Sequence, residues 1–386
     1  MGSITKINFP FSLSRVRQSV SEKPMAVFFG ADFYNLPLDA NQGLFIEKTN
    51  EILNLIRKEL PKHKLVYQPH PNETDEFSKL DLRGFEVGEH TIAEIYLYEN
   101  ASAIDYVFSA QSGASIAAFS MGFDSVIFLD LLHGALSEET IVGYRSYFDG
   151  LPESFFMKSF TGPLYRRNQR SSEIELRALT MISSLINPNK TLFVLSSDPS
   201  TALRGAVLVR QLRRQFPLLT AKLIMINHRR WQLAKDNPTV AGSFNEIILL
   251  PWSRVWYSTN WANLEKTFRA ARTLRKQTFE VGETLISLAH GLFEENAILS
   301  YHSHLNKILL IENRWYKFIY DGGYRELPSG GWEDSWGARL FNHFLEPLLG
   351  LYRTVYREYQ DGKVLNLFRY QKDPEQIYDK ILVLMP

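Results

Sequence analysis

The chain contains no cysteine among its 386 residues, which excludes disulfides and thiolate metal sites. It also has no excess of charge of either sign, because 43 Lys and Arg residues are balanced by 42 Asp and Glu residues. Without a global positive field, nucleic acid is not an expected partner. Any anionic ligand must therefore be held by local groups.

The sequence has no apolar run near the roughly 20 residues that a membrane-spanning helix needs. Its start, MGSITKINFPFSLSRVRQ, also lacks the apolar core of a signal peptide. We therefore expect a cytoplasmic protein. Short basic clusters are usually solvated, but they leave open a peripheral contact with the anionic inner membrane or a charged glycan. These clusters are Arg166-Arg167, Arg213-Arg214 and His228-Arg229-Arg230.

Two common phosphate motifs are absent as well. The sequence has no P-loop and no GxGxxG fingerprint, so readings as an ATPase or a dehydrogenase lose their main support. His302 and His304 lie two apart in a predicted helix, which is not the i, i+4 spacing of a helical metal site. We expect neither a metal nor a cofactor.

Short apolar runs alternate with helical patterns along most of the chain, which is typical of strand-helix units on a parallel sheet. Helices are predicted at 45–60, 202–216, 261–274, 296–304 and 340–359. Strands are predicted at 25–29, 64–68, 105–108, 125–129, 191–195, 222–226, 246–250, 284–289, 307–312 and 316–320. The fold class is therefore α/β, with parallel sheets.

The length exceeds what one hydrophobic core usually serves, so two Rossmann-like domains are expected. We place an N-terminal tail at 1–23, a first domain at 24–150, a connection with one helix at 151–189, and a second domain at 190–335. The remaining residues, 336–386, are expected to form a helical segment that packs across both domains.

A histidine and a proline follow the second predicted strand, in the segment YQPHPNET. The loop after a parallel strand faces the ligand, and Pro71 biases His70 toward an extended backbone. A protonated His70 could neutralise charge on a departing phosphate. The alternative is an ordinary surface histidine. Gly30 directly follows the first predicted strand, 25–29, and is a further candidate for contact with the ligand.

A serine-rich turn follows the next strand. The residues Ser109, Gln111, Ser112, Gly113 and Ser115 lead into a predicted helix, where hydroxyls and backbone N–H groups form an anion site. Simple N-capping by a serine is the alternative. Since this turn and the His-Pro pair are expected at adjacent strand ends, a nucleotide phosphate site is favoured.

Glu94 lies near a helix start between these two segments. Its carboxylate could accept hydrogen bonds from ribose hydroxyls, or merely complement the helix dipole.

In the second half, Asp321 follows an apolar run and precedes Gly322 and Gly323. The glycines permit a sharp turn that could present the carboxylate at a cleft, as a general base or a nucleophile. An Asp-Gly turn between strands is the alternative.

Three more residues of this half follow strands and could bind sugar or acceptor hydroxyls. They are Ser197, Thr201 and His290, although capping of the next helix is an alternative role for Ser197 and Thr201.

These motifs resemble those of bacterial sialyltransferases and related CMP-sugar transferases of the GT-B fold. His70-Pro71 is similar to the family's His-Pro motif, residues 109–115 to its serine motif, and Asp321-Gly322 to its acidic motif. The resemblance implies that His70, Ser112 and Ser115 contact the CMP phosphate. Gly322 replaces the family's second acidic residue, for which Glu312 or Glu326 is a candidate.

The order of the motifs differs from the family, whose acidic motif comes first. The resemblance therefore implies that the two halves are permuted, with the nucleotide-binding half leading the chain. It implies metal-independent transfer of sialic acid or Kdo from a CMP donor to a glycan acceptor, in bacterial surface-polysaccharide or lipooligosaccharide synthesis. Alternatives are retention through a covalent bond to Asp321, a UDP-sugar transferase or epimerase, and a non-catalytic glycan-binding module.

Overall fold

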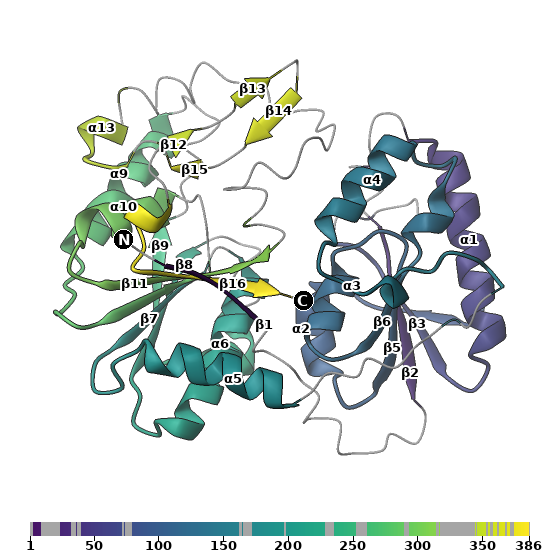
Figure 1. Cartoon of the computed structure of the whole chain (residues 1–386), viewed down its shortest axis with the longest axis horizontal. Helices are drawn as coiled ribbons and strands as arrows, with labels where there is room; N and C mark the ends of the chain where they lie inside the picture. Colours follow the sequence, from purple (N-terminus) through teal and green to yellow (C-terminus); the bar gives the residue numbers. More distant parts are fainter. Residues whose placement is uncertain are drawn as a thin grey trace. The chain divides into compact units, whose positions relative to one another are not determined.

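The computed structural model describes residues 3–8, 24–31, 36, 40–71, 73, 79–161, 164, 172–196, 198–227, 235–251, 261–288, 293–313, 316, 344, 346–352, 354–355, 358–360, 363–366, 369–370 and 374–385. The chain divides into two compact units, and the division falls within helix α5, between Ile174 and Glu175. Each unit contains one parallel sheet, and we call them the five-stranded unit and the seven-stranded unit (Figure 1).

The five-stranded sheet has the strand order β4-β3-β2-β5-β6. Its strands are β2 (Met25–Phe29), β3 (Lys64–Gln68), β4 (Phe85–Val87), β5 (Ile104–Ser109) and β6 (Asp124–Ile127). All neighbouring pairs are parallel. Because the first strand of this unit lies in the middle, the order reverses between β2 and β5, as in a Rossmann fold.

Helices cover both faces of this sheet (Figure 1). They are α1 (Gln42–Glu59), α2 (Ala93–Glu99), α3 (Ala114–Ser120), α4 (Glu138–Tyr147) and the 3-10 helices η3 (Leu129–Leu132) and η4 (Glu153–Phe155). Alternate strand residues point to opposite faces. Phe28 therefore packs in the core with Phe45 of α1, whereas Val27 packs in a second core with Leu97 of α2 and Ala118 of α3.

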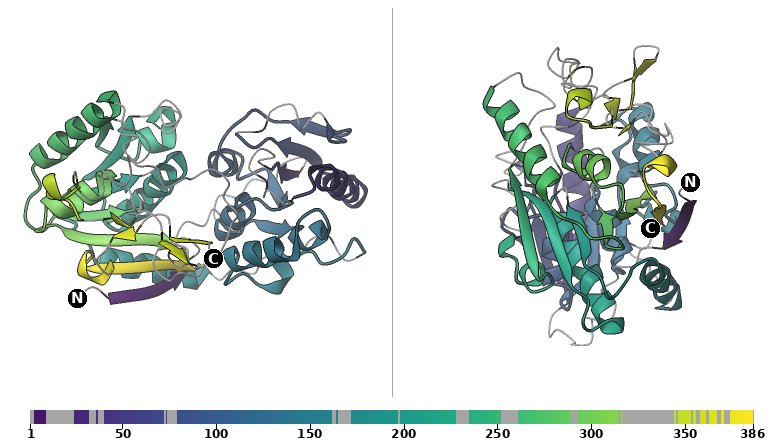
Figure 2. Two further views of the ribbon diagram at one scale, coloured as in Figure 1. Left: turned by 90° about the horizontal axis from the view of Figure 1, so that it is seen from above. Right: turned by 90° about the vertical axis from the view of Figure 1, so that its left-hand side faces the viewer.

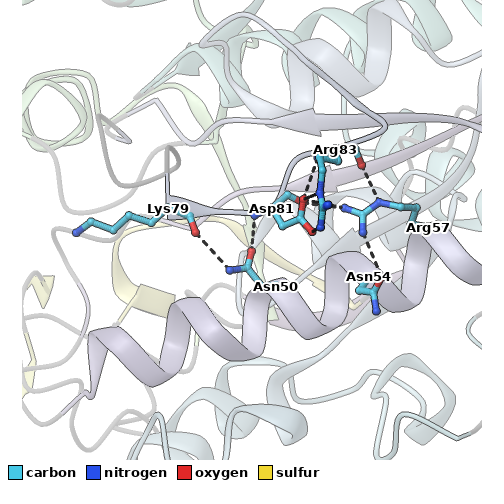
Figure 3. Close-up of polar contacts among 6 residues, drawn as sticks. All are labelled: Asn50, Asn54, Arg57, Lys79, Asp81 and Arg83. Carbon is cyan, nitrogen blue, oxygen red and sulfur yellow. Dashed lines mark hydrogen bonds and ion pairs between the residues drawn. The ribbon is translucent and has the colours of Figure 1, made fainter.

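Helix α1 also holds the connection between β3 and β4 (Figure 3). The Arg57 guanidinium donates to the backbone oxygens of Arg83 (2.7 Å) and Asp81 (2.8 Å) and lies over the Phe85 ring. Asn50 Oδ1 accepts from the Asp81 N–H at 2.6 Å. The side chains of Arg83 and Asp81 form two further bonds of 2.7 Å, which lower the pKa of Asp81 well below its usual range. Residues 79–83 are thus attached to α1 through backbone and side chain.

The seven-stranded sheet has the order β1-β16-β11-β10-β7-β8-β9. Its strands are β1 (Ser3–Asn8), β7 (Leu192–Ser196), β8 (Ala221–Asn227), β9 (Glu246–Pro251), β10 (Thr284–Ser287), β11 (Asn306–Glu312) and β16 (Lys380–Met385). Six of them repeat the Rossmann order, with β7 as the first strand, and β1 extends the sheet beyond β16.

The helices of this unit are α5 (Ser172–Ser184), α6 (Pro199–Gln215), α8 (Pro238–Ala241), α9 (Trp261–Lys276) and α10 (Phe293–Tyr301). Helix α6 begins at a capping box, in which Asp198 Oδ1 accepts from the Thr201 N–H and Thr201 Oγ1 accepts from the Asp198 N–H. Gly205 brings α6 close to the sheet, since a Cβ atom there would lie 2.7 Å from Val194 Cγ1. On the other face, α9 and α10 contribute Ala270 and Ile298 to the core.

These two parallel sheets confirm the α/β fold class with two Rossmann-like domains. Each predicted strand from 25–29 to 307–312 is present within one or two residues of its expected bounds. The predicted strand at 316–320 lies outside the described residues, apart from Tyr316. No helix in the described part of the chain is long and apolar enough to cross a membrane.

The N-terminal tail is one correction. Residues Ser3–Asn8 form β1, which pairs in parallel with β16 (Figure 2, left, dark purple beside yellow). The five-stranded unit therefore does not lead the chain but follows β1 of the other unit, although it precedes α5–β16 as expected. A short alternating segment such as SITKIN gives little signal when its partner strand lies at the other end of the chain.

The C-terminal segment is a second correction. In place of a helix at 340–359, the described residues hold the short helix α13 (Glu346–Leu348) and the strands β12 (Thr354–Val355) and β13 (Glu358–Gln360). These strands pair with β15 (Arg369–Tyr370) and β14 (Lys363–Asn366), and the 3-10 helix η8 (Pro374–Gln376) leads to β16. Gly350, with φ +70°, stops the helix, and β-branched and aromatic residues then favour strands. The segment belongs to the seven-stranded unit rather than to both.

Candidate functional site

Three loops leave the five-stranded sheet at the same level. Phe29, the last residue of β2, pairs with Gln68 of β3 on one side and with Ser109 of β5 on the other. Gly30, the His70 loop (residues 69–71 and 73) and the serine turn (residues 109–115) therefore all begin at the carboxyl edge. The two polar loops were expected on adjacent strands, but β2 lies between β3 and β5. The order reversal between β2 and β5 places this edge where Rossmann-type sheets bind ligands.

A buried carboxylate fixes the backbone of the His70 loop. Glu73 Oε2 accepts from the His70 N–H at 2.9 Å, and the Glu73 N–H donates to the His70 carbonyl oxygen at 2.8 Å. Glu73 Oε1 accepts from the Tyr67 hydroxyl at 2.5 Å. The His90 ring adds a fourth contact, with Nδ1 3.1 Å from the His70 oxygen. His70 itself is half-buried.

Tyr67 and Glu73 were missed by sequence reasoning. Burial, followed by the neighbouring Glu73 charge, raises the pKa of Tyr67, so its hydroxyl stays protonated and donates. Gly30 makes room for this pair, since a Cβ atom on Gly30 would lie 2.3 Å from Glu73 Oε2 and 2.6 Å from Tyr67 Oη. A carboxylate three residues after His70 was the one available signal.

The serine turn divides into an inner and an outer part. Ser109 and Ser115 are fully buried, and their Oγ atoms lie 2.6 Å apart. Ser125 Oγ donates to the Ser115 carbonyl oxygen at 3.0 Å. Ser109 and Ser115 thus brace the turn from inside. The half-buried Ser112 and Gly113 form the outer part, in which Ser112 Oγ accepts from the Ala114 N–H at 3.2 Å.

Two amide oxygens at this edge have no hydrogen-bond donor within reach in the described structure. They are Oε1 of Gln111, in the serine turn, and Oε1 of Gln68, at the end of β3. Gln68 is fully buried, and its Nε2 donates to the Glu89 carbonyl oxygen. An unsatisfied buried acceptor costs about 1–3 kcal/mol. Gln68 carried no sequence signal beyond its place at a strand end.

The remaining residues predicted in the first half have simple positions. Glu94 lies half-buried in the first turn of α2, where its charge complements the helix dipole. The ribose contact stays a prediction. Pro71 directly follows His70 in the turn that Glu73 closes.

In the seven-stranded unit, Thr201 takes the capping role that was its alternative. Its Oγ1 also lies 2.9 Å from Oγ of Ser196 at the end of β7. Ser197, His290, Asp321, Gly322 and Glu326 lie outside the described residues. Glu312, a candidate for the second acidic residue, forms a buried ion pair with Arg204 of α6.

Glu295, which the sequence did not single out, is fully buried in α10. Its Oε1 accepts from the hydroxyls of Ser287, at 2.8 Å, and Tyr378. This cluster joins α10 to β10 and to Tyr378, which lies between η8 and β16. In the described ranges no group of three or more His, Asp and Glu side chains could hold a metal ion.

Comparison with known proteins gives little further guidance. No protein-family model and no curated protein matches the chain. Similar solved structures include UDP-GlcNAc 2-epimerase from Neisseria meningitidis bound to UDP-GlcNAc, with 12% identity over 75% of this chain and 82% of that chain and a TM-score of 0.21. Another is S. aureus MnaA with UDP, with 12% identity over 85% and 90% of the two chains and a TM-score of 0.22. TM-scores this low carry no weight in the choice of function.

Proposed function

We propose that the chain is an enzyme acting on a nucleotide sugar, and that the nucleotide binds at the carboxyl edge of the five-stranded sheet. One observation carries this proposal. Gly30, the His70 loop and the serine turn leave the sheet at one level, on the two sides of the order reversal between β2 and β5. Ligands of open α/β sheets bind at such a reversal.

The residues at this edge suit the phosphate of a nucleotide. Protonated His70 would neutralise charge as the phosphate departs, and Ser112 and Gly113 would supply polar groups beside it. Ser109 and Ser115 would act by shaping the turn. This refines the role implied by the sequence resemblance, in which Ser115 contacts the phosphate itself.

For the reaction, we propose transfer of sialic acid or Kdo from a CMP donor to a glycan hydroxyl. The support is the sequence resemblance of His70-Pro71, the serine turn and Asp321-Gly322 to CMP-sugar transferases. Asp321 would remove the proton of the acceptor hydroxyl while His70 stabilises the departing CMP, and no metal is invoked. The C–O bond between sugar and CMP breaks as the bond to the acceptor oxygen forms.

A UDP-sugar transferase or epimerase is the second candidate, because the same architecture can bind either nucleotide. The two candidates differ in the base that the site prefers. Thermal unfolding with CMP, UDP and GDP in parallel separates them, since a bound ligand raises the unfolding temperature according to its affinity. Nucleotide release from CMP-linked and UDP-linked sugars then identifies the donor.

The first prediction concerns His70. His70→Gln should reduce nucleotide release about 100-fold, because a neutral amide cannot donate a proton to the departing phosphate. The matched control is His63→Gln, in the same unit but directly before β3, where His63 Nε2 lies 3.1 Å from Asp105 Oδ2. Full turnover of His70→Gln, or a wild-type chain that neither binds nor cleaves any nucleotide sugar, would overturn the proposal.

A further inference from the structure

We infer that Glu73 and Tyr67 are positioning residues that hold the backbone of His70 at the proposed nucleotide site. The effect on catalysis rests on the proposed function, whereas the contacts from which the inference is argued do not depend on it. Neither residue was part of the site expected from the sequence.

The geometry is a closed set of hydrogen bonds. The carboxylate of Glu73 accepts from the hydroxyl of Tyr67, a residue of β3, and from the N–H of His70, a residue of the loop. The Glu73 N–H returns a bond to the His70 oxygen. One side chain therefore ties the start of the loop to the rigid strand, and the His70 backbone is bonded at both its N–H and its C=O.

Burial makes these bonds strong. Glu73 is 3% exposed and Tyr67 is fully buried, so water competes little for either group. The Tyr67 ring also stacks on Phe28, with ring centroids 5.9 Å apart, which fixes the hydroxyl that Glu73 needs. Gly30 leaves the space that the carboxylate occupies.

The chemistry requires a carboxylate rather than a side chain of the same shape. Oε1 of Glu73 accepts from the Tyr67 hydroxyl, and Oε2 accepts from the His70 N–H. A glutamine has one acceptor oxygen, so Glu73→Gln can accept from only one of these two donors, and its NH₂ group takes the place of the other carboxylate oxygen. Tyr67→Phe removes one donor only and should have a smaller effect in the same direction.

A misplaced catalytic group loses rate steeply, and small displacements can cost up to about 100-fold. We expect Glu73→Gln to lower nucleotide release about 10-fold and Tyr67→Phe about 3-fold. In a His70→Gln background both changes should have almost no further effect, because they act through His70. A merely structural role would instead lower the rate by the same factor in both backgrounds.

Amide hydrogen exchange of His70 tests the inference without any reaction. Exchange should accelerate at least about 10-fold in Glu73→Met, because this side chain has no oxygen to accept from the His70 N–H. The control is Thr49→Val, which removes a buried hydroxyl of the same unit, bonded at 2.8 Å to the Phe45 oxygen in α1, and should leave His70 exchange unchanged. If exchange of His70 does not change in Glu73→Met, or if the rate losses of Glu73→Gln and Tyr67→Phe simply multiply with that of His70→Gln, the inference is wrong. A wild-type chain without any nucleotide chemistry, but with accelerated exchange in the variant, would overturn only the proposed function.

Discussion

Gly30 illustrates how a residue without a side chain can determine the position of charged ones. The space over its Cα is filled by the Glu73 carboxylate and the Tyr67 hydroxyl, and both would have to move if a Cβ atom were added. At this scale only part of the site could be predicted from the sequence. His70 and Ser112 could be placed by their position after strands, because that position depends only on chain order. The Glu73 contact depends on the path of the loop, and the inward turn of Ser109 and Ser115 depends on packing, so neither follows from spacing.

Gly30→Ala should lower the free energy of unfolding by about 1–3 kcal/mol, as expected for overpacking of a closed site. Urea unfolding measures this change. The matched variant is Gly43→Ala in α1, where the nearest atom to a new Cβ is 3.5 Å away, so a gain of up to about 1 kcal/mol is expected. Equal effects of the two variants would contradict this account of Gly30.

At the scale of elements, α1 is more than a cover for the sheet. Through Arg57 and Asn50 it binds the backbone that leads into β4, so the edge strand of this unit is attached by a helix that lies far from it in sequence (Figure 3). The apolar stripe of α1 was readable from its spacing. The polar attachment was not, because its partners are backbone atoms of an irregular connection. The strand β4 was missed because three residues are too few to show an alternating pattern.

Arg57→Met should destabilise the five-stranded unit by about 1–3 kcal/mol, since two backbone oxygens lose a charged donor. Asn54→Ala is the comparison, because it removes only the 3.2 Å contact to Arg57 on the exposed side and should cost less than about 0.5 kcal/mol. Chemical unfolding followed by circular dichroism distinguishes them. A loss in Arg57→Met no larger than that in Asn54→Ala would show that the attachment contributes little.

At the scale of the whole molecule, the pH dependence of stability has an identifiable source. Burial lowers the pKa of His302, which lies in the seven-stranded unit with Nε2 2.8 Å from the Leu274 oxygen, and nearby His304 and Lys307 add to this effect. The unfolded chain therefore takes up a proton near its ordinary pKa of about 6.5, before the folded chain does. The contribution of neutral, buried His302 to the free energy of unfolding is therefore complete above that pH and is lost as the pH falls below it.

His302→Gln should flatten the fall in the free energy of unfolding between about pH 7 and pH 5, because glutamine does not titrate and can still donate to the Leu274 oxygen. Urea unfolding at a series of pH values measures the slope for both proteins. An unchanged slope would assign the pH dependence to other groups.

The pairing of β1 with β16 has a consequence for how the protein is made. Strand β1 precedes the other described strands in the chain, whereas β16, with which it pairs, follows all of them. During synthesis the five-stranded unit can fold as soon as β6 and its helices are complete, because domains fold as units and the N-terminal ones first. The seven-stranded sheet can be completed only after β16 has been synthesised, so a chain stopped before Lys380 would leave β1 without this pairing strand and expose β11 to other chains.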